Sequence, residues 1–429
     1  MVFTLDRPNV HQPVIQSLDN GLTIIAEQIP VDAVSFNIWL DVGSAIETDD
    51  INGMAHFLEH MMFKGTPNLA LGEFEQMVEQ RGAMTNAATS QDYTHYYITT
   101  APEDFGTLAP LQVDLLLNPS LEEEHFTKER LVVLEEIRRS QDNPSRRSFN
   151  KAIDLFFQRL PYRRPILGPE AIIADLHYQQ MRDFHSHWYH PSAMTATVVG
   201  NLPVEQLIDV VATAYGKHYQ RQDLPFHHDL HRSKSHPPEP KFDHIIRQEH
   251  IDPDLQQARL IMGWRVPGLE HLNETYGLDV VAAVLGQGKM ARLFRDLREE
   301  RGLVTQIGAN NMTFTVQGIF YIYALMPGEN LGEVEALIKE HIHRLSQELI
   351  NAKDLERIGK KVASRHIFGM ERPSDRSNLY GYYYSQLSHL EPAFNYVEKI
   401  QSYTAEDLRQ TVVNYLDPNA YAITTIKPG

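Results

Sequence analysis

The sequence predicts an α+β protein with two homologous domains, each a largely antiparallel sheet with helices packed on it. Three observations predict this: the length of the chain, an internal repeat, and strand-like segments that alternate with blocks of helical pattern. The chain has 429 residues, 42% of them hydrophobic and 22% charged. One hydrophobic core rarely organises more than about 200 residues, so at least two domains are expected.

The internal repeat consists of four short matches that occur in the same order in both halves. Each half also carries a strand-like run of aromatic and β-branched residues that ends at a Pro-containing turn. The matches are QRGAMT (80–85) with ERGLVT (300–305), YTHYYITTAPED with IFYIYALMPGEN, NPSRRS (143–148) with RPSDRS (372–377), and YHPSAMTATVV from Tyr189 with YLDPNAYAITT from Tyr415. Because the four matches occur in the same order in both halves, they indicate duplication of a whole domain.

The expected elements follow from hydrophobic periodicity and from turn residues. In the first half we predict strands at 22–27 and 33–42, helices at 52–63 and 72–80, a strand pair within 83–100, a helical block, and a closing strand and helix. Residues 220–242 are rich in Pro, His and charge, which predicts a solvated linker. We therefore expect a catalytic domain at 1–219 and a homologous domain without metal ligands at 243–429.

Composition excludes several classes of protein and of site. The chain has no cysteine, so neither disulfides nor thiolate metal sites are possible, and a metal would need His, Asp or Glu. The net charge of −17 argues against binding nucleic acid or an anionic membrane. No apolar run approaches the ~20 residues that cross a bilayer, and no signal peptide is visible. We expect a cytoplasmic protein.

The stretch GMAHFLEHMMFKG carries a candidate metal site. On a helix, His56 and His60 project from one face and can share one ion, with Glu59 beside them. Zinc accepts imidazole nitrogens, and a nearby carboxylate can act as general base toward water. HxxEH is thus chemically equivalent to HExxH read backwards. The residues that can cap this helix are Asp49, Asp50 and Asn52.

A chance match is the alternative, since the chain has 21 histidines and a helix can carry two of them for packing alone. The repeat argues against this alternative. A shift of 220 residues places Tyr276 and Val280 opposite His56 and His60, so the same helix is expected in the second half without ligands. A purely structural need for the histidine pair would apply to both halves.

A third ligand is expected on the predicted helix FTKERLVVLEEIRRS, residues 126–140. Glu129 and Glu136 share the apolar face of this helix, whereas Glu135 lies beside residues suited to surface ion pairs. We predict Glu136 as the metal ligand and Glu129 as the group that orients a histidine or the substrate. The apolar face is marked by Phe126, Val133 and Ile137.

The chain resembles the inverzincins, the family of pitrilysin, insulin-degrading enzyme and the mitochondrial processing peptidases, and above all its short bacterial-type members with two homologous halves. The resemblance covers nearly the whole chain and rests on GMAHFLEHMMFKGT, NAATSQDYTHYY, ERLVVLEEIRR and ARLFRDLREERGL. It implies the processing-peptidase or LuxS-like architecture and a zinc endopeptidase that hydrolyses peptides or unfolded segments inside a clamshell chamber. It also implies one Zn²⁺ per chain, with roles for His56, Glu59, His60, Glu129 and Glu136 as above.

The resemblance further implies how substrate is held. The segment Asn86, Ala87, Ala88 and Thr89 looks like the edge to which family members add substrate as an extra strand, although an ordinary strand is the alternative. Self-sufficient members carry an Arg and a Tyr in the second half that bind substrate and stabilise the oxyanion. Here Arg298 or Arg301 is available, but Thr305 stands where the tyrosine is expected.

Thr305 favours a heterodimer with a homologous subunit that lacks HxxEH and supplies the tyrosine, while a homodimer stays possible. One alternative function is a non-catalytic core subunit of a larger complex, and the intact motif argues against it. Another is a zinc hydrolase of non-peptide amides or esters. A paired or buried edge at Asn86 to Thr89 would favour this last alternative.

Overall fold

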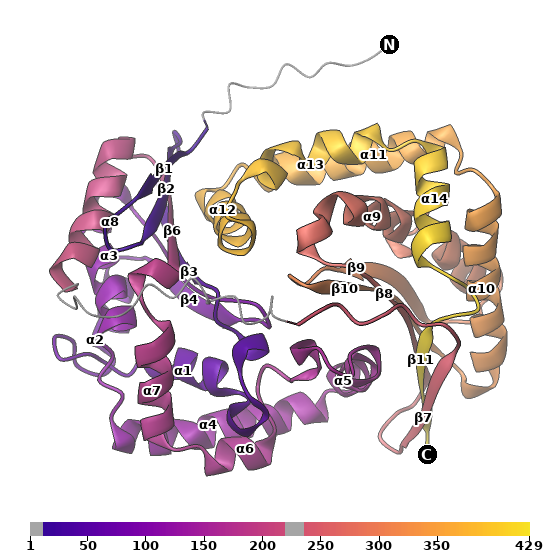
Figure 1. The fold of residues 1–429 in the computed structure, drawn as a ribbon, viewed down its shortest axis with the longest axis horizontal. Helices are drawn as coiled ribbons and strands as arrows, with labels where there is room; N and C mark the ends of the chain where they lie inside the picture. The colour runs from indigo at the N-terminus through magenta and orange to yellow at the C-terminus, as the bar shows by residue number, and fades with distance from the viewer. Residues whose placement is uncertain (1–11, 219–235) are drawn as a thin grey trace.

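Two separate β-sheets organise residues 12–218 and 236–429, which are the residues described by this computed structural model (Figure 1). The first sheet contains β1 (Val14–Ser17), β2 (Thr23–Gln28), β3 (Val34–Leu40), β4 (Met84–Thr89), β5 (Thr94–Thr100) and β6 (Met194–Gly200). The second contains β7 (Ile246–Asp252), β8 (Ala258–Pro267), β9 (Gln306–Met312), β10 (Gln317–Met326) and β11 (Ala422–Pro428).

The strand orders are β1-β2-β6-β3-β5-β4 and β7-β11-β8-β10-β9. One pair in each sheet is parallel, β2 with β6 and β7 with β11, and the remaining pairs are antiparallel. The predicted class of two largely antiparallel sheets with packed helices is therefore confirmed. β4 and β9 occupy corresponding edges of the two sheets.

Helices cover both sheets. Those of the first half are α1 (Met54–Met62), α2 (Glu73–Gln80), α3 (Pro102–Leu117), α4 (Glu123–Asp142), α5 (Pro144–Phe156), α6 (Glu170–Asp175), α7 (Tyr178–Trp188) and α8 (Val204–His218). Those of the second half are α9 (Leu272–Gly286), the π-helix η7 (Phe294–Glu300), α10 (Leu331–Gln347), α11 (Ala352–Phe368), α12 (Pro373–Leu387), α13 (Glu391–Ser402) and α14 (Ala405–Tyr415).

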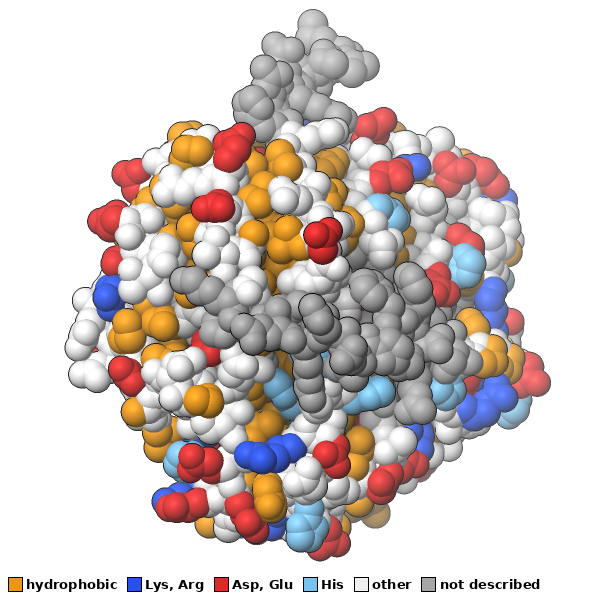
Figure 2. All heavy atoms as spheres, turned by 60° about the vertical axis from the view of Figure 1, so that its left-hand side comes forward, with side chains coloured by type: hydrophobic (Ala, Val, Ile, Leu, Met, Phe, Trp, Pro, Cys, Tyr) orange, Lys and Arg blue, Asp and Glu red, His pale blue; other side chains and the backbone are white. Residues whose placement is uncertain are grey.

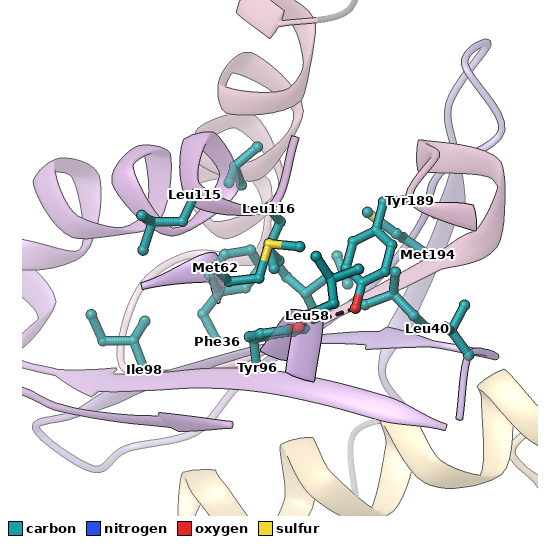
Figure 3. Packing of buried hydrophobic residues seen from close by; sticks show 14 of the residues in the cluster. Phe36, Leu40, Leu58, Met62, Tyr96, Ile98, Leu115, Leu116, Tyr189 and Met194 are labelled. Atoms are coloured by element: carbon teal, nitrogen blue, oxygen red, sulfur yellow. Dashed lines mark hydrogen bonds between the residues drawn. The ribbon is translucent and has the colours of Figure 1, made fainter. Parts of the chain in front are cut away.

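The core of the first half lies between the sheet and the helices α1 and α3. Phe36 of β3 packs there with Leu58 and Met62 of α1, and all three are fully buried (Figure 3). Within this core the hydroxyls of Tyr96 and Tyr189 lie 3.1 Å apart, so each buried hydroxyl has a hydrogen-bonding partner. The apolar face of α1 is thereby fixed, which directs its polar face away from the core.

Each half donates one helix to the sheet of the other half. The helix α12 packs on β3 and β6, and α5 packs on β8 and β11 (Figure 1). Close approach needs glycine in both places, because a Cβ on Gly381 would lie 2.0 Å from Trp39 and one on Gly263 would lie 2.4 Å from Phe156. Both helices begin at the repeated motif NPSRRS or RPSDRS, so the exchange is reciprocal.

The observed elements agree closely with the prediction, with two differences. The strand β1 was not predicted, because all four of its residues are exposed and show no apolar alternation. Most of the predicted linker, residues 220–235, lies outside the described residues, so the domain limits stay a prediction. At the end of that segment Glu239 is buried and accepts hydrogen bonds from the backbone of residues 158–160, so this part is anchored and not solvated.

The described helices include none that is both long and apolar enough to span a bilayer. On the face that Figure 2 shows, acidic side chains are widely scattered, and Lys and Arg side chains are fewer and mostly separate. This distribution is consistent with the net charge of −17.

Candidate metal centre

The helix α1 begins with a buried carboxylate that reaches in from outside the helix. Glu47 accepts hydrogen bonds from the backbone N–H groups of Gly53 and Ala55, each at 2.8 Å, and from the Asn52 amide at 2.7 Å. A negative charge at a helix N-terminus meets the positive end of the helix dipole. Burial opposes this charge and raises the pKa of Glu47 to about 7.

The predicted capping of α1 by Asp49, Asp50 or Asn52 is therefore wrong. The Asn52 side chain instead supports Glu47, and Asp49 is turned to the surface, where it pairs with Arg163 and Arg164. The chain enters the helix through Gly53 at a φ of 98°. A side chain there would be strained, and its Cβ would lie within 3 Å of atoms of Ile173, Leu167 and Gly168.

The three predicted metal ligands lie together. The donor atoms of His56, His60 and Glu136 are all within 4.8 Å of one another. The Glu136 Oε2 atom lies 3.6 Å from Nε2 of His56 and 3.5 Å from Nε2 of His60. Two imidazole nitrogens and one carboxylate oxygen are the donor set of many catalytic zinc sites, which keep one further position for water. The residues present therefore fit zinc.

The two histidines differ in their affinity for protons. Burial, aided by the neighbouring His60, lowers the pKa of His56 to about 4. Burial also acts to lower the pKa of His60, but the hydrogen bonds that its ring donates to Glu129 and Glu136 outweigh burial and raise this pKa to about 9. In the metal-free protein at neutral pH His60 is therefore the histidine that carries the additional proton, which a metal must displace.

Glu129 and Glu135 lie on different faces of α4. A Glu129 oxygen is 3.0 Å from Nδ1 of His60, and the other oxygen is 2.7 Å from the Lys64 ammonium. Glu135 is exposed and pairs with Arg139 at 3.2 Å. The face predicted to hold Glu129 and Glu136 is the one turned toward α1. The pattern of the sequence gives no signal for Lys64, which follows His60 by four residues.

Glu59 is held by the edge strand β4. The Thr89 hydroxyl donates a hydrogen bond to the Glu59 carboxylate, and Thr94 in turn donates to Thr89 at 3.3 Å. Burial raises the pKa of Glu59, and the hydrogen bond from Thr89 acts against this shift. A carboxyl with a raised pKa is a stronger base than an ordinary carboxylate, and a fixed direction suits it to proton transfer.

The predicted substrate strand is an exposed edge of the first sheet. β4 pairs with β5 on one side, and within the described ranges no strand pairs with its other side. Asn86 and Ala88 are exposed, and Ala87 and Thr89 are half-buried. The N–H and C=O groups on the free side of β4 are thus positioned to pair with an extended peptide.

The structure does not bring Arg298, Arg301 or Thr305 to this centre. Arg301 pairs with Asp296 at 2.8 Å, Arg298 lies over the ring of Phe294, and Thr305 donates to Gln257 at 2.8 Å. Among the described residues, neither guanidinium forms a hydrogen bond or ion pair with His56, His60 or Glu136. Both arginine side chains are exposed.

The second half keeps the shape of the site without its ligands. Tyr276 and Val280, opposite the two histidines in the repeat, are buried in the second core. Asp279 stands 220 residues after Glu59, and burial raises its pKa to about 6. The Asn311 amide donates to Asp279 at 2.9 Å from the edge strand β9. A shift of 220 applied to the whole motif would have found Asp279, because acidic residues occupy both positions.

Both halves match models of one peptidase family. Residues 23–170 match the model described as insulinase, peptidase family M16, and residues 175–362 match the model described as the peptidase M16 inactive domain. Together these matches span most of the chain, from the strand β2 into the helix α11.

Relatives and a solved structure match along almost the full chain. An uncharacterized zinc protease of Rickettsia felis is 27% identical over 398 residues, which cover 92% of this chain and 93% of that protein. A second, of Bacillus subtilis, is 28% identical over 370 residues, covering 84% and 85%. The crystal structure of a protease from Helicobacter pylori is 24% identical with a TM-score of 0.89, covering 97% of this chain and 99% of that one, which shows a shared fold.

Proposed function

Because the chain belongs to peptidase family M16, the insulinase family, we propose that it is a zinc-dependent endopeptidase acting on peptides or unfolded protein segments. Relatives named zinc proteases support a peptidase activity. The observation that carries the proposal is the convergence of His56, His60 and Glu136 beside Glu59. The resemblance to pitrilysin-like peptidases, drawn from the motifs, is confirmed by these family matches.

Each polar residue of the centre receives one role. His56, His60 and Glu136 would hold the zinc ion, and Glu129 would orient His60 through its Nδ1 atom. When bound, zinc supplies a Lewis acid that polarises the substrate carbonyl and acidifies water. Glu59 takes the proton of the attacking water and passes it to the leaving amine. The Thr89 hydroxyl keeps the Glu59 carboxylate directed toward this task.

A peptide substrate is favoured over a small amide or ester by the exposure of β4. A segment that pairs with β4 would run past Thr89, whose hydroxyl contacts Glu59, so its main chain would pass the general base. Recognition through backbone hydrogen bonds gives affinity and tolerates many side chains. A paired or buried edge at Asn86 to Thr89 would have supported the alternative substrates, but among the described residues the outer side of β4 pairs with no strand, and Asn86 and Ala88 are exposed.

A homologous partner subunit is part of the proposal. Thr305 offers a short hydroxyl, already bonded to Gln257, where the family's tyrosine is expected to stabilise the oxyanion. The exposed Arg298 and Arg301 are free of the chain's own metal centre and suited to act across an interface. We infer a heterodimer with a subunit that supplies the tyrosine, enclosing a chamber, with a homodimer as the alternative assembly.

The alternative function, a non-catalytic core subunit, needs neither a metal nor a base. Such a role gives no reason for two histidines and a glutamate to converge beside a second, half-buried carboxyl. In the part that the structure describes, the second half has the same helix without a metal site, because Tyr276 and Val280 occupy the positions of the two histidines.

The direct test is zinc content and chelator-sensitive peptide hydrolysis by the full chain, purified alone and with co-expressed homologues. We expect about one zinc per chain, and hydrolysis that a chelator abolishes and added zinc restores. A chain that binds no zinc, alone or with a partner, would contradict the proposal.

A further inference from the structure

The metal centre extends into a ladder of five side chains that alternate between α1 and α4. The Lys64 ammonium lies 2.7 Å from Glu129, and Glu129 lies 3.0 Å from His60. Glu136 lies 3.5 Å from His60 and 3.6 Å from His56. His56 and His60 are four apart on α1, and Glu129 and Glu136 are seven apart on α4, so each pair lies on one helical face. Lys64 stands four residues after His60, just beyond the end of α1. Lys64 forms the end of the ladder farthest from His56.

The backbone around Lys64 is fixed independently of the ion pair. Lys64 follows the end of α1, where its N–H bonds to the Met61 carbonyl at 3.1 Å. Gly65 then turns the chain at a φ of 96°, and its carbonyl accepts a hydrogen bond from the backbone of Ser120 at 3.0 Å. Thr66 bonds to the buried Asp114 of α3 at 2.6 Å. The ammonium group therefore starts from a defined place.

The two oxygens of Glu129 have different partners. One faces Nδ1 of His60 and the other faces the Lys64 ammonium, and the Glu129 side chain is only 12% exposed. An ion pair shielded from water in this way is weakened little by salt. With one oxygen held by Lys64, the carboxylate cannot turn away from His60, and the Nε2 atom of His60 stays directed at the centre.

His56 has no comparable support. Its Nδ1 atom is buried and, in the part of the chain that the structure describes, has no hydrogen-bond partner. The orientation of the histidine pair toward a metal therefore depends on the branch through Glu129. We propose that Lys64 is a positioning residue of the metal centre, which acts on zinc through Glu129 and His60. This inference rests on the proposed zinc site.

A merely structural role is the competing explanation, because the Lys64 pair also joins α1 to α4. The two roles differ in what they change. A structural tie changes the unfolding temperature of the metal-free protein but not the zinc affinity of the folded molecules. A positioning role changes the zinc affinity of folded protein and acts only while Glu129 is present.

The experiment compares the full chain with Lys64→Met, which keeps the stem and removes the charge, and with Lys64→Arg, which keeps the charge. Lys128→Met is the matched control, because Lys128 lies on α4 and pairs with Glu124 at 2.6 Å on the exposed surface. Zinc dissociation constants come from competition with a chromophoric chelator. Unfolding temperatures are measured without metal, and kcat and KM at saturating zinc.

We expect Lys64→Met to bind zinc about tenfold more weakly than the wild type. This is the lower end of the loss in affinity that follows removal of a group supporting a metal ligand. Lys64→Arg should recover most of the affinity, and Lys128→Met should match the wild type. The double variant Lys64→Met with Glu129→Gln should bind zinc no more weakly than Glu129→Gln alone. At saturating zinc, KM should remain that of the wild type, because Lys64 does not touch substrate. If Lys64→Met fails to fold, Lys64→Gln replaces it.

Unchanged zinc affinity in folded Lys64→Met, or additive losses in the double variant, would overturn the inference. In either case a wild type that binds zinc and hydrolyses peptides leaves the proposed function intact. A wild type that binds no zinc would overturn the proposed function, and the role of Lys64 with it.

Discussion

The Thr89 hydroxyl donates a hydrogen bond to the Glu59 carboxylate, and so joins the edge strand of the first sheet to the helix that carries His56 and His60. The second half repeats this relationship with other residues, since Asn311 of β9 donates to Asp279 of α9 at 2.9 Å. Both halves thus have a hydrogen bond from edge strand to helix, but only the first half carries the histidine pair on that helix. In the first half this hydrogen bond holds the carboxylate that we propose as the general base.

Removing either histidine should abolish stable zinc binding. His56→Ala and His60→Ala each leave two protein ligands, which is fewer than catalytic zinc sites use. His244→Ala is the control, because His244 is exposed and pairs with the neighbouring Asp243. Metal analysis after dialysis should give about one zinc per chain for wild type and control and almost none for the others. Full occupancy in the double histidine variant would refute the ligand assignment.

Glu129, Glu135 and Glu136 of α4 should differ in how strongly their substitution weakens zinc binding. Glu136→Gln should remove most of the zinc, because it removes a ligand. Glu129→Gln should cost roughly 10–100-fold in affinity or activity, as expected for a group that orients a ligand. Glu135→Gln is the control, since its surface pair with Arg139 contributes little. Chelator competition measures all three, and the greatest loss in Glu135→Gln would show that the helix face was misassigned.

Zinc binding should release a proton at neutral pH. The pKa of His60 is about 9 in the metal-free protein, above the ordinary 6.5, whereas His56 is already neutral with a pKa of about 4. Zinc requires both rings neutral, so about one proton should leave per ion between pH 7 and 8. Calorimetry in buffers of different ionisation enthalpy measures this number. Binding without proton release would contradict the shift.

The raised pKa of His60 also makes the stability of the metal-free protein depend on pH. Because the folded pKa of His60 lies above its unfolded value, its contribution is complete below about pH 6.5 and is lost as the pH rises through about 9. The unfolding temperature of the metal-free wild type should fall over this window. In His60→Ala that fall should be smaller.

A partner should raise activity if the heterodimer proposal holds. Loss of one oxyanion donor typically costs on the order of 10²–10³ in turnover, so the chain alone should be weak. Thr305→Tyr, or mixing with a two-half homologue that lacks HxxEH, should increase peptide hydrolysis. Full activity of the isolated chain, with no gain from either change, would count against the heterodimer and leave the zinc site unaffected.

The sequence was sufficient to place the ligands because helical spacing determines which side chains share a face. Four residues separate His56 from His60, and seven separate Glu129 from Glu136, so the pattern alone directed each pair to one side of its helix. The HxxEH motif and the repeat then indicated which half carries the candidate metal site. Edge exposure at β4 followed from the family resemblance and not from periodicity.

Helical spacing and short motifs could not predict contacts between one element and residues outside it. Glu47 caps α1 from six residues before Gly53, outside the turn positions where capping residues are sought. Asn311 corresponds to Thr89 at a shift of 222, whereas Asp279 corresponds to Glu59 at 220, so no single shift reveals the shared hydrogen bond. The exchange of α5 and α12 between the sheets was also not predictable, because an apolar helix face does not specify which sheet it covers.

The most direct test of the zinc peptidase is Glu59→Gln, which keeps size and hydrogen bonding but removes the base. Peptide hydrolysis should be measured for wild type and variant at equal zinc content, with and without a chelator. The account predicts that the variant retains about one zinc and loses at least ~10²-fold in turnover, while the chelator stops the wild type. Unchanged turnover in zinc-loaded Glu59→Gln would contradict it.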